Sequence, residues 1–207
     1  MSCHNIPVFL PHAGCPHRCL FCDQHSISGT VRTPAPEEVR AYLEECLAHY
    51  PHDPVQTEIA FFGGSFTCMD LDYQRALLDI GRELVSQYGL KGIRLSTRPD
   101  GISPQIIRHL LEYPVQAGEL GAQSMNDEVL GKNRRGHTAA DTVRAAGLIR
   151  QTGLELGLQM MVGLLGDTAD TVWETARALA NLQPDTVRIY PMVILRDTPA
   201  FALWEKG

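Results

Sequence analysis

The stretch IPVFLPHAGCPHRCLFC, residues 6–22, joins a short apolar run to three closely spaced cysteines. The run at 6–10 contains β-favouring residues between turn-forming ones and predicts a strand. Cys15, Cys19 and Cys22 follow it with the spacing C-x3-C-x2-C. In proteins with parallel sheets, ligands bind at the carboxyl ends of the strands, where such a loop lies. The stretch therefore predicts a strand with a binding loop at its carboxyl end.

The same alternation of strand and helix continues along the whole chain. Strands are expected at residues 6–10, 58–62, 92–96, 115–119, 156–162 and 186–190. Helices are expected at about 36–50, at 70–88, after Ser103, from Thr138 to Gly153, and at about 168–182. Strictly alternating elements imply a parallel sheet with right-handed crossovers. Periodicity alone leaves two α/β architectures open, a doubly wound sheet and an incomplete barrel of six βα units.

Composition and charge predict one soluble domain. The chain has 207 residues, of which 44% are hydrophobic, so it can bury a full core. No apolar run approaches the roughly 18 residues that span a bilayer, and the N-terminus lacks the pattern of a signal peptide. We therefore expect a cytoplasmic protein that does not enter a membrane. The net charge of -6 argues against a duplex-binding surface, and the basic group Lys132, Arg134 and Arg135 fits a solvated turn or a binding role equally well.

The six cysteines predict metal or redox chemistry rather than disulfides, because clustered thiols in a cytosolic protein more often bind metal. Cys46 is expected on the buried face of a helix, and Cys3 and Cys68 receive no role. The three clustered thiolates can hold a four-iron cluster whose fourth iron stays open to a small ligand with an amino and a carboxylate group. The alternative is zinc, with His12, His17 or His25 as the fourth ligand.

Other segments strengthen the first of these readings through a family resemblance. The cysteine motif, with Phe21 just before its last cysteine, resembles that of the radical S-adenosylmethionine (SAM) superfamily. The chain also resembles the radical SAM domain of the Elongator catalytic subunit family and its bacterial relatives, over residues 6–207. The matching segments are FFGGSFT at 61–67, STRPD at 96–100, ELGAQS at 119–124, NRRGHT at 133–138, MVGLLG at 161–166 and RIYP at 188–191. The resemblance implies the incomplete (β/α)6 TIM-like barrel of the radical SAM core.

The resemblance also implies the residues of the site. Cys15, Cys19 and Cys22 would hold a [4Fe-4S] cluster. The expected contacts to SAM are Phe21 beside the adenine, Gly63, Gly64 and Ser65 at the methionyl end, and Ser96, Gln123, Arg135 and Gln159. Gln123 and Arg135 match positions that contact SAM in oxygen-independent coproporphyrinogen oxidases, and a guanidinium suits the SAM carboxylate. Ser96 and Gln159 stand where relatives often have Glu and Asp, so these two contacts are weakened. No residue beyond the cluster ligands is assigned a catalytic role.

The function implied by the resemblance is reductive cleavage of SAM, with an electron from an external reductant, to a 5′-deoxyadenosyl radical that abstracts hydrogen from a substrate. The matches to the Elongator family favour RNA, specifically tRNA. A tetrapyrrole or another small molecule, and a non-catalytic module that binds cluster and SAM, remain alternatives. The chain carries no acetyltransferase-like sequence, so the resemblance covers only the radical SAM half of Elongator-type activity.

The end of the chain gives a further expectation. Residues 1–207 should form one radical SAM core domain that lacks a C-terminal extension, because the chain stops at Trp204-Glu-Lys-Gly207, where a sixth helix should begin. Strand six would then need a C-terminal domain or a partner to cover it.

Overall fold

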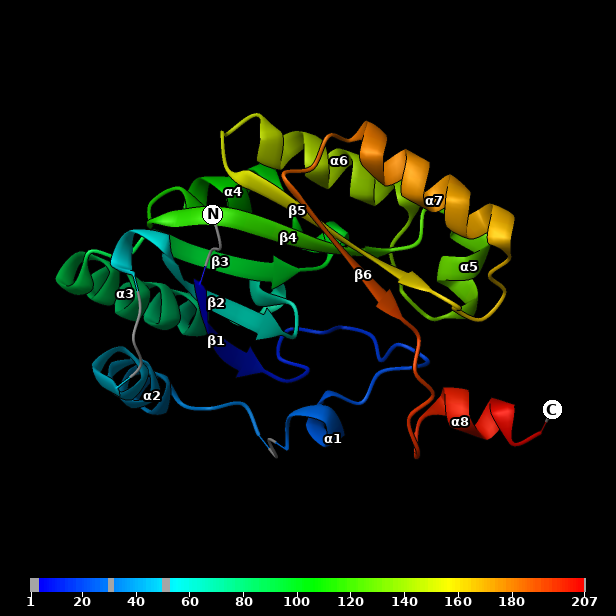
Figure 1. The fold of residues 1–207 in the computed structure, drawn as a ribbon, viewed down its shortest axis with the longest axis horizontal. Helices are drawn as coiled ribbons and strands as arrows, with labels where there is room; N and C mark the ends of the chain where they lie inside the picture. The colour runs from blue at the N-terminus through cyan, green and yellow to red at the C-terminus, as the bar shows by residue number, and fades with distance from the viewer. Residues whose placement is uncertain (1–3, 30–31, 50–52, 207) are drawn as a thin grey trace.

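The sheet is a six-stranded half-barrel. The structure is a computed structural model that describes residues 4–29, 32–49 and 53–206. Its strands are β1 (His4–Leu10), β2 (Thr57–Gly63), β3 (Gly92–Thr97), β4 (Val115–Gln123), β5 (Glu155–Val162) and β6 (Thr186–Pro191). Every pairing is parallel, and the strands lie side by side in sequence order. A doubly wound sheet reverses its order at a switch point. The unbroken order therefore confirms the incomplete barrel, with β1 and β6 as its two edges (Figure 1).

Helices cover the convex face of the sheet. The main ones are α2 (Pro36–His49), α3 (Leu71–Tyr88), α4 (Pro104–Leu110), α6 (Ala139–Arg150) and α7 (Ala169–Asn181). Leu43 of α2 and Leu77 of α3 belong to one apolar cluster with the first three strands, and Ile149 of α6 belongs to a second with β4 and β5. The capping box predicted at Thr138 and Asp141 is present. However, α6 ends at Arg150 rather than at Gly153, because a turn occupies residues 151–153.

The concave face of the sheet carries several charged side chains. Outward residues such as Ile59 and Leu95 alternate along the strands with charged ones that face the barrel interior. Buried Arg94 lies 2.7 Å from Glu58 and 3.4 Å from Glu119, and Lys91 lies 3.1 Å from Glu58. Burial works against charge on Arg94, yet its bond to Glu58 holds its pKa above the usual value. The interior thus contains a set of ion pairs.

The segment after β6 corrects one expectation. A short helix, α8 (Pro199–Trp204), does follow β6, with Thr198 as its N-cap and proline in its first turn. It does not cover β6. Figure 1 shows it beneath the carboxyl ends of the strands, where the Ala200 amide donates a 3.0 Å hydrogen bond to the Leu20 carbonyl. The outer face of β6 is exposed, with Val187 at 47% and Ile189 at 63% exposure.

The structure also contains short elements that the sequence pattern does not predict. Short helices at α1 (Gln24–Ser28) and α5 (Asp127–Lys132), and the 3-10 turns η1 (Pro54–Gln56), η2 (Phe66–Cys68) and η3 (Pro99–Gly101), were not foreseen. Cys46 lies on α2 but is only partly buried, and Cys3 lies outside the described residues. The five cysteines within the described ranges are free thiols. No helix among these residues is long and apolar enough to cross a membrane.

Candidate cofactor site

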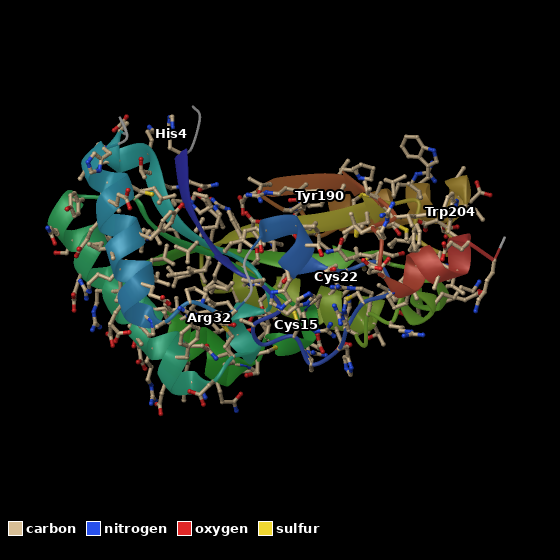
Figure 2. The ribbon with its side chains drawn as sticks, turned by 90° about the horizontal axis from the view of Figure 1, so that it is seen from below. His4, Cys15, Cys22, Arg32, Tyr190 and Trp204 are labelled. Carbon is tan, nitrogen blue, oxygen red and sulfur yellow. The ribbon has the colours of Figure 1, made fainter. Side chains whose placement is uncertain are left out.

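A cavity of about 160 Å³ opens at the carboxyl ends of the strands. Its lining contains the three cysteines of the motif and most of the residues expected to contact SAM. The full lining is His12, Cys15, His17, Cys19, Phe21, Cys22, Gln24, Gly63, Gly64, Ser96, Thr97, Arg98, Gly121, Gln123, Arg135 and Gln159. Figure 2 shows Cys15 and Cys22 near one another beside α1, close to the middle of the molecule.

Both backbone groups of Leu20, in the middle of the cysteine loop, form hydrogen bonds to other parts of the chain. The Leu20 amide donates a 3.1 Å hydrogen bond to the carbonyl of Asn133, and the Leu20 carbonyl accepts the bond from Ala200. Further along, the Gln24 side-chain amide donates to the Gly63 carbonyl over 2.6 Å, and its oxygen accepts from the His12 amide. The loop is thus tied to the ends of β2, α5 and α8, so the cysteines are held against the sheet.

The Gly63-Gly64 pair allows the first loop to cross β2 closely. A Cβ on Gly64 would lie 2.0 Å from the Ala13 carbonyl oxygen, and Gly63 has a positive φ of 104°. The next residue, Ser65, does not line the cavity. Its buried hydroxyl bonds to the Thr97 hydroxyl at 2.9 Å and accepts from the Arg98 amide at 3.2 Å, so the side chain holds β2 to β3.

Opposing effects act on the pKa values of the Cys15 and Cys22 thiols. Burial, followed by the neighbouring Cys19, raises the pKa of Cys22 to about 12 and that of Cys15 above its ordinary value. Arg135 opposes both shifts. Its Nη1 also donates to the Cys19 sulfur at 3.0 Å. A metal that binds buried thiols displaces their protons, because its positive charge stabilises the thiolates.

Three residues assigned to SAM present buried polar atoms that the protein leaves unpaired. Ser96 Oγ, Gln123 Oε1 and Arg135 Nε have no hydrogen-bond partner within the described part of the chain. Gln123 also has a left-handed backbone, with φ of 65°, a conformation that costs a non-glycine residue on the order of 1 kcal/mol. Since buried polar groups are normally paired, these atoms point to a polar ligand.

Gln159 connects the cavity to the barrel interior. Its side-chain amide donates to Glu119 at 2.8 Å, and Glu119 in turn pairs with Arg188 at 2.9 Å. Phe21 lines the cavity and is half-buried. The basic group of the sequence is divided: Arg135 is buried, Lys132 pairs with Glu128, and Arg134 is exposed.

One of the three histidines considered for zinc already has a hydrogen-bond partner. Nε2 of His12 already accepts a 3.0 Å hydrogen bond from the Gln24 amide.

Arg98 and Gln24 line the cavity but were not predicted as site residues. Arg98 is 4% exposed and binds Asp100 through two bonds of 3.0 Å. It lies in the STRPD segment at 96–100, and the position of this segment directly after β3 was the available signal. Gln24 directly follows the cysteine motif, yet its contact with β2 could not be read from local sequence.

The comparison with protein families decides the class of the chain. The sequence model described as "Radical SAM superfamily" matches residues 9–179. The chain belongs to the radical SAM superfamily. Membership implies a [4Fe-4S] cluster and SAM, and the residues present fit both groups. Three free thiols and three unpaired polar atoms meet in one cavity of this radical SAM chain.

Individual relatives agree with this assignment. The radical SAM chain is 26% identical to the tRNA uridine(34) acetyltransferase of Methanocaldococcus infernus, over 98% of this chain and 45% of that protein. The solved archaeal Elp3 of the same organism, with an N-terminal deletion, superposes with a TM-score of 0.73 at 23% identity, covering 100% of this chain and 50% of that one. Coproporphyrinogen III oxidase of Escherichia coli gives 0.69 at 18% identity, with coverage of 99% and 47%. The chain thus spans about half the length of these relatives.

Proposed function

We propose that this protein is a radical SAM enzyme that modifies RNA, with tRNA as its substrate. The observation that carries the radical SAM part of the proposal is the meeting of three free thiols with the unpaired atoms of Ser96, Gln123 and Arg135 in one cavity. When bound, the cluster and SAM supply a 5′-deoxyadenosyl radical that abstracts hydrogen. The chain's own residues bind these groups, orient them and exclude water.

The proposed roles follow from the cavity lining. Cys15, Cys19 and Cys22 hold iron, and Phe21 packs beside the adenine. Gly63 and Gly64 present backbone groups to the methionyl end, a role in which the Ser65 hydroxyl takes no part because it is bonded to Thr97. Polar contacts to SAM come from Ser96, Gln123, Arg135 and Gln159.

The proposed RNA substrate rests on the relatives. A protein named for tRNA uridine(34) acetylation matches nearly the whole chain. We propose a cytoplasmic location, where thiols stay reduced and tRNA is present, and an external one-electron reductant. We also propose that residues 1–207 form one core domain, and that a further domain or a partner covers β6, whose outer face is exposed. Tetrapyrrole chemistry is the second candidate, favoured by the structural likeness to coproporphyrinogen III oxidase.

The test is anaerobic reconstitution with iron and sulfide, followed by incubation with SAM and dithionite. Formation of 5′-deoxyadenosine that rises with added tRNA supports the proposal. The matched control is C15A, which removes one proposed iron ligand. Stimulation by coproporphyrinogen instead of tRNA would transfer the proposal to tetrapyrroles. Cluster and SAM binding without any cleavage would identify a non-catalytic module, and stoichiometric zinc without iron uptake would refute the class of site.

A further inference from the structure

The side chain of Arg135 donates hydrogen bonds to the cysteine motif and to the sheet. Its side chain is buried, with the residue 7% exposed. Nη1 donates to the sulfur of Cys19 at 3.0 Å, and Nη2 donates to the carbonyl of Gly121 at 2.6 Å. Both terminal nitrogens therefore have protein partners, and only Nε lacks one in the described structure. One guanidinium thus joins a proposed iron ligand to the inner face of β4.

The turn that carries Arg135 is fixed independently of this contact. Asn133 is fully buried, and its side-chain amide donates to the carbonyls of Val129 at 2.8 Å and Leu165 at 2.9 Å. Gly136 has φ of 72°, and a Cβ there would lie 2.2 Å from the His17 ring. The Asn133 carbonyl also accepts the Leu20 amide. The cysteine loop and the turn therefore contact each other at several points, which keeps the guanidinium beside Cys19.

A guanidinium in this position has a definite electrostatic effect. Arginine side chains in proteins carry a positive charge, and this one donates to a sulfur atom that retains lone pairs when it binds iron. Reduction of an iron–sulfur cluster adds one negative charge, and hydrogen bonds to the sulfurs and nearby charge set its reduction potential. A fixed positive charge beside Cys19 therefore stabilises the reduced form more than the oxidised form.

We propose that Arg135 is a positioning residue that raises the reduction potential of the cluster. It acts through its hydrogen bond to Cys19. One electron from an external donor converts the cluster from its 2+ to its 1+ state, and no covalent bond or proton changes at Arg135. This role differs from a contact with the SAM carboxylate, because it operates in the absence of SAM. It rests on the proposed function only in requiring that the three cysteines hold the cluster.

The experiment is a redox titration of the reconstituted protein without SAM, with dithionite as the reductant and the reduced cluster followed by electron paramagnetic resonance. The variants are R135M, which removes charge and donors, and R135K, which keeps the charge. The matched control is R188Q, which removes a guanidinium that contacts Glu119 and Phe62 rather than a cysteine. Iron content and circular dichroism are measured for each protein.

R135M is expected to shift the potential downward, so that the ratio of reduced to oxidised cluster at a fixed potential falls about tenfold, or about 59 mV for one electron. R135K should shift less, and R188Q should match the wild type. If R135M does not retain iron, R135Q, which also removes the charge, replaces it in the comparison with R135K. Potentials equal to that of the wild type in every iron-loaded Arg135 variant would overturn this role while leaving the proposed function intact. A wild type that takes up no iron would overturn both.

Discussion

The side-chain amide of Gln24 donates a 2.6 Å hydrogen bond to the carbonyl oxygen of Gly63. This bond joins the residue just after the cysteine motif to the glycine pair at the end of β2. Because the Gln24 oxygen also accepts from the His12 amide, one side chain holds the loop on two sides.

Q24A is therefore expected to lower the free energy of unfolding by about 1 to 3 kcal/mol, since it removes two partly buried hydrogen bonds. It should also weaken SAM binding by the reconstituted protein, because Gly63 is no longer held in place. Urea denaturation and equilibrium binding of SAM measure the two effects. The control is Q105A at an exposed position of α4. Equal stability of Q24A and Q105A would show that the Gln24 contacts contribute nothing.

The cysteine motif gives a prediction about iron. Replacement of Cys15, Cys19 or Cys22 with Ala should each abolish the visible absorption of anaerobically reconstituted protein, whereas the wild type should bind about four irons per chain. C46A is the matched control, because Cys46 lies on α2, away from the cavity lining. Iron analysis and absorption spectra decide the matter. Full absorption in any of the three motif variants would remove that cysteine from the ligand set.

The sequence predicted where the strands lie but not how they pair. Five strands lie within two residues of their expected bounds, because apolar runs between turn residues mark strands of a parallel sheet, and β4 continues four residues beyond its expected end to Gln123. Periodicity did not distinguish a barrel from a doubly wound sheet, since that choice depends on which strands pair. The short helices α1, α5 and α8 have five or six residues, too few for a periodic signal. The contact between Arg135 and Cys19 joins residues far apart in sequence, and local pattern cannot reveal it.

The ion pairs inside the barrel give a prediction about stability. R94M should cost about 3 to 5 kcal/mol, because it leaves the buried carboxylates of Glu58 and Glu119 without this partner. The control is R75M on α3, whose ion pair with Asp72 is exposed and should be worth less than about 1 kcal/mol. Urea denaturation at neutral pH measures both. A loss in R94M no larger than in R75M would mean that the remaining cations compensate.

His137 gives a prediction about pH. Burial, with the charge of Arg135, lowers the pKa of His137 to about 4, against 6.5 for an ordinary histidine. The unfolded chain therefore binds the proton more readily than the folded one between these values. The stabilising contribution is complete above pH 6.5 and is lost as the pH falls toward 4.

H137Q should accordingly change the pH dependence of stability. The free energy of unfolding of the wild type should fall relative to H137Q by about 2 kcal/mol between pH 7 and pH 5. Urea denaturation of both proteins at several pH values measures this difference, from which other titrating groups cancel. A difference that does not vary with pH would show that His137 keeps its ordinary pKa in the folded protein.

The last prediction concerns the exposed face of β6. Val187 and Ile189 point away from the barrel interior and are 47% and 63% exposed, and β6 pairs on one side only, with β5, in the described sheet. An exposed apolar face beside a free strand edge favours association. We expect the 207-residue chain to self-associate as its concentration rises.

The double variant V187K/I189K should remain monomeric, because like charges on the face repel. V143K, at an exposed position of α6, is the matched control and should associate like the wild type. Light scattering under nitrogen measures the mass of each protein. A longer form, where the gene encodes one, should be more stable and monomeric if its added segment covers β6. A wild-type chain that stays monomeric at high concentration would show that this face needs no cover.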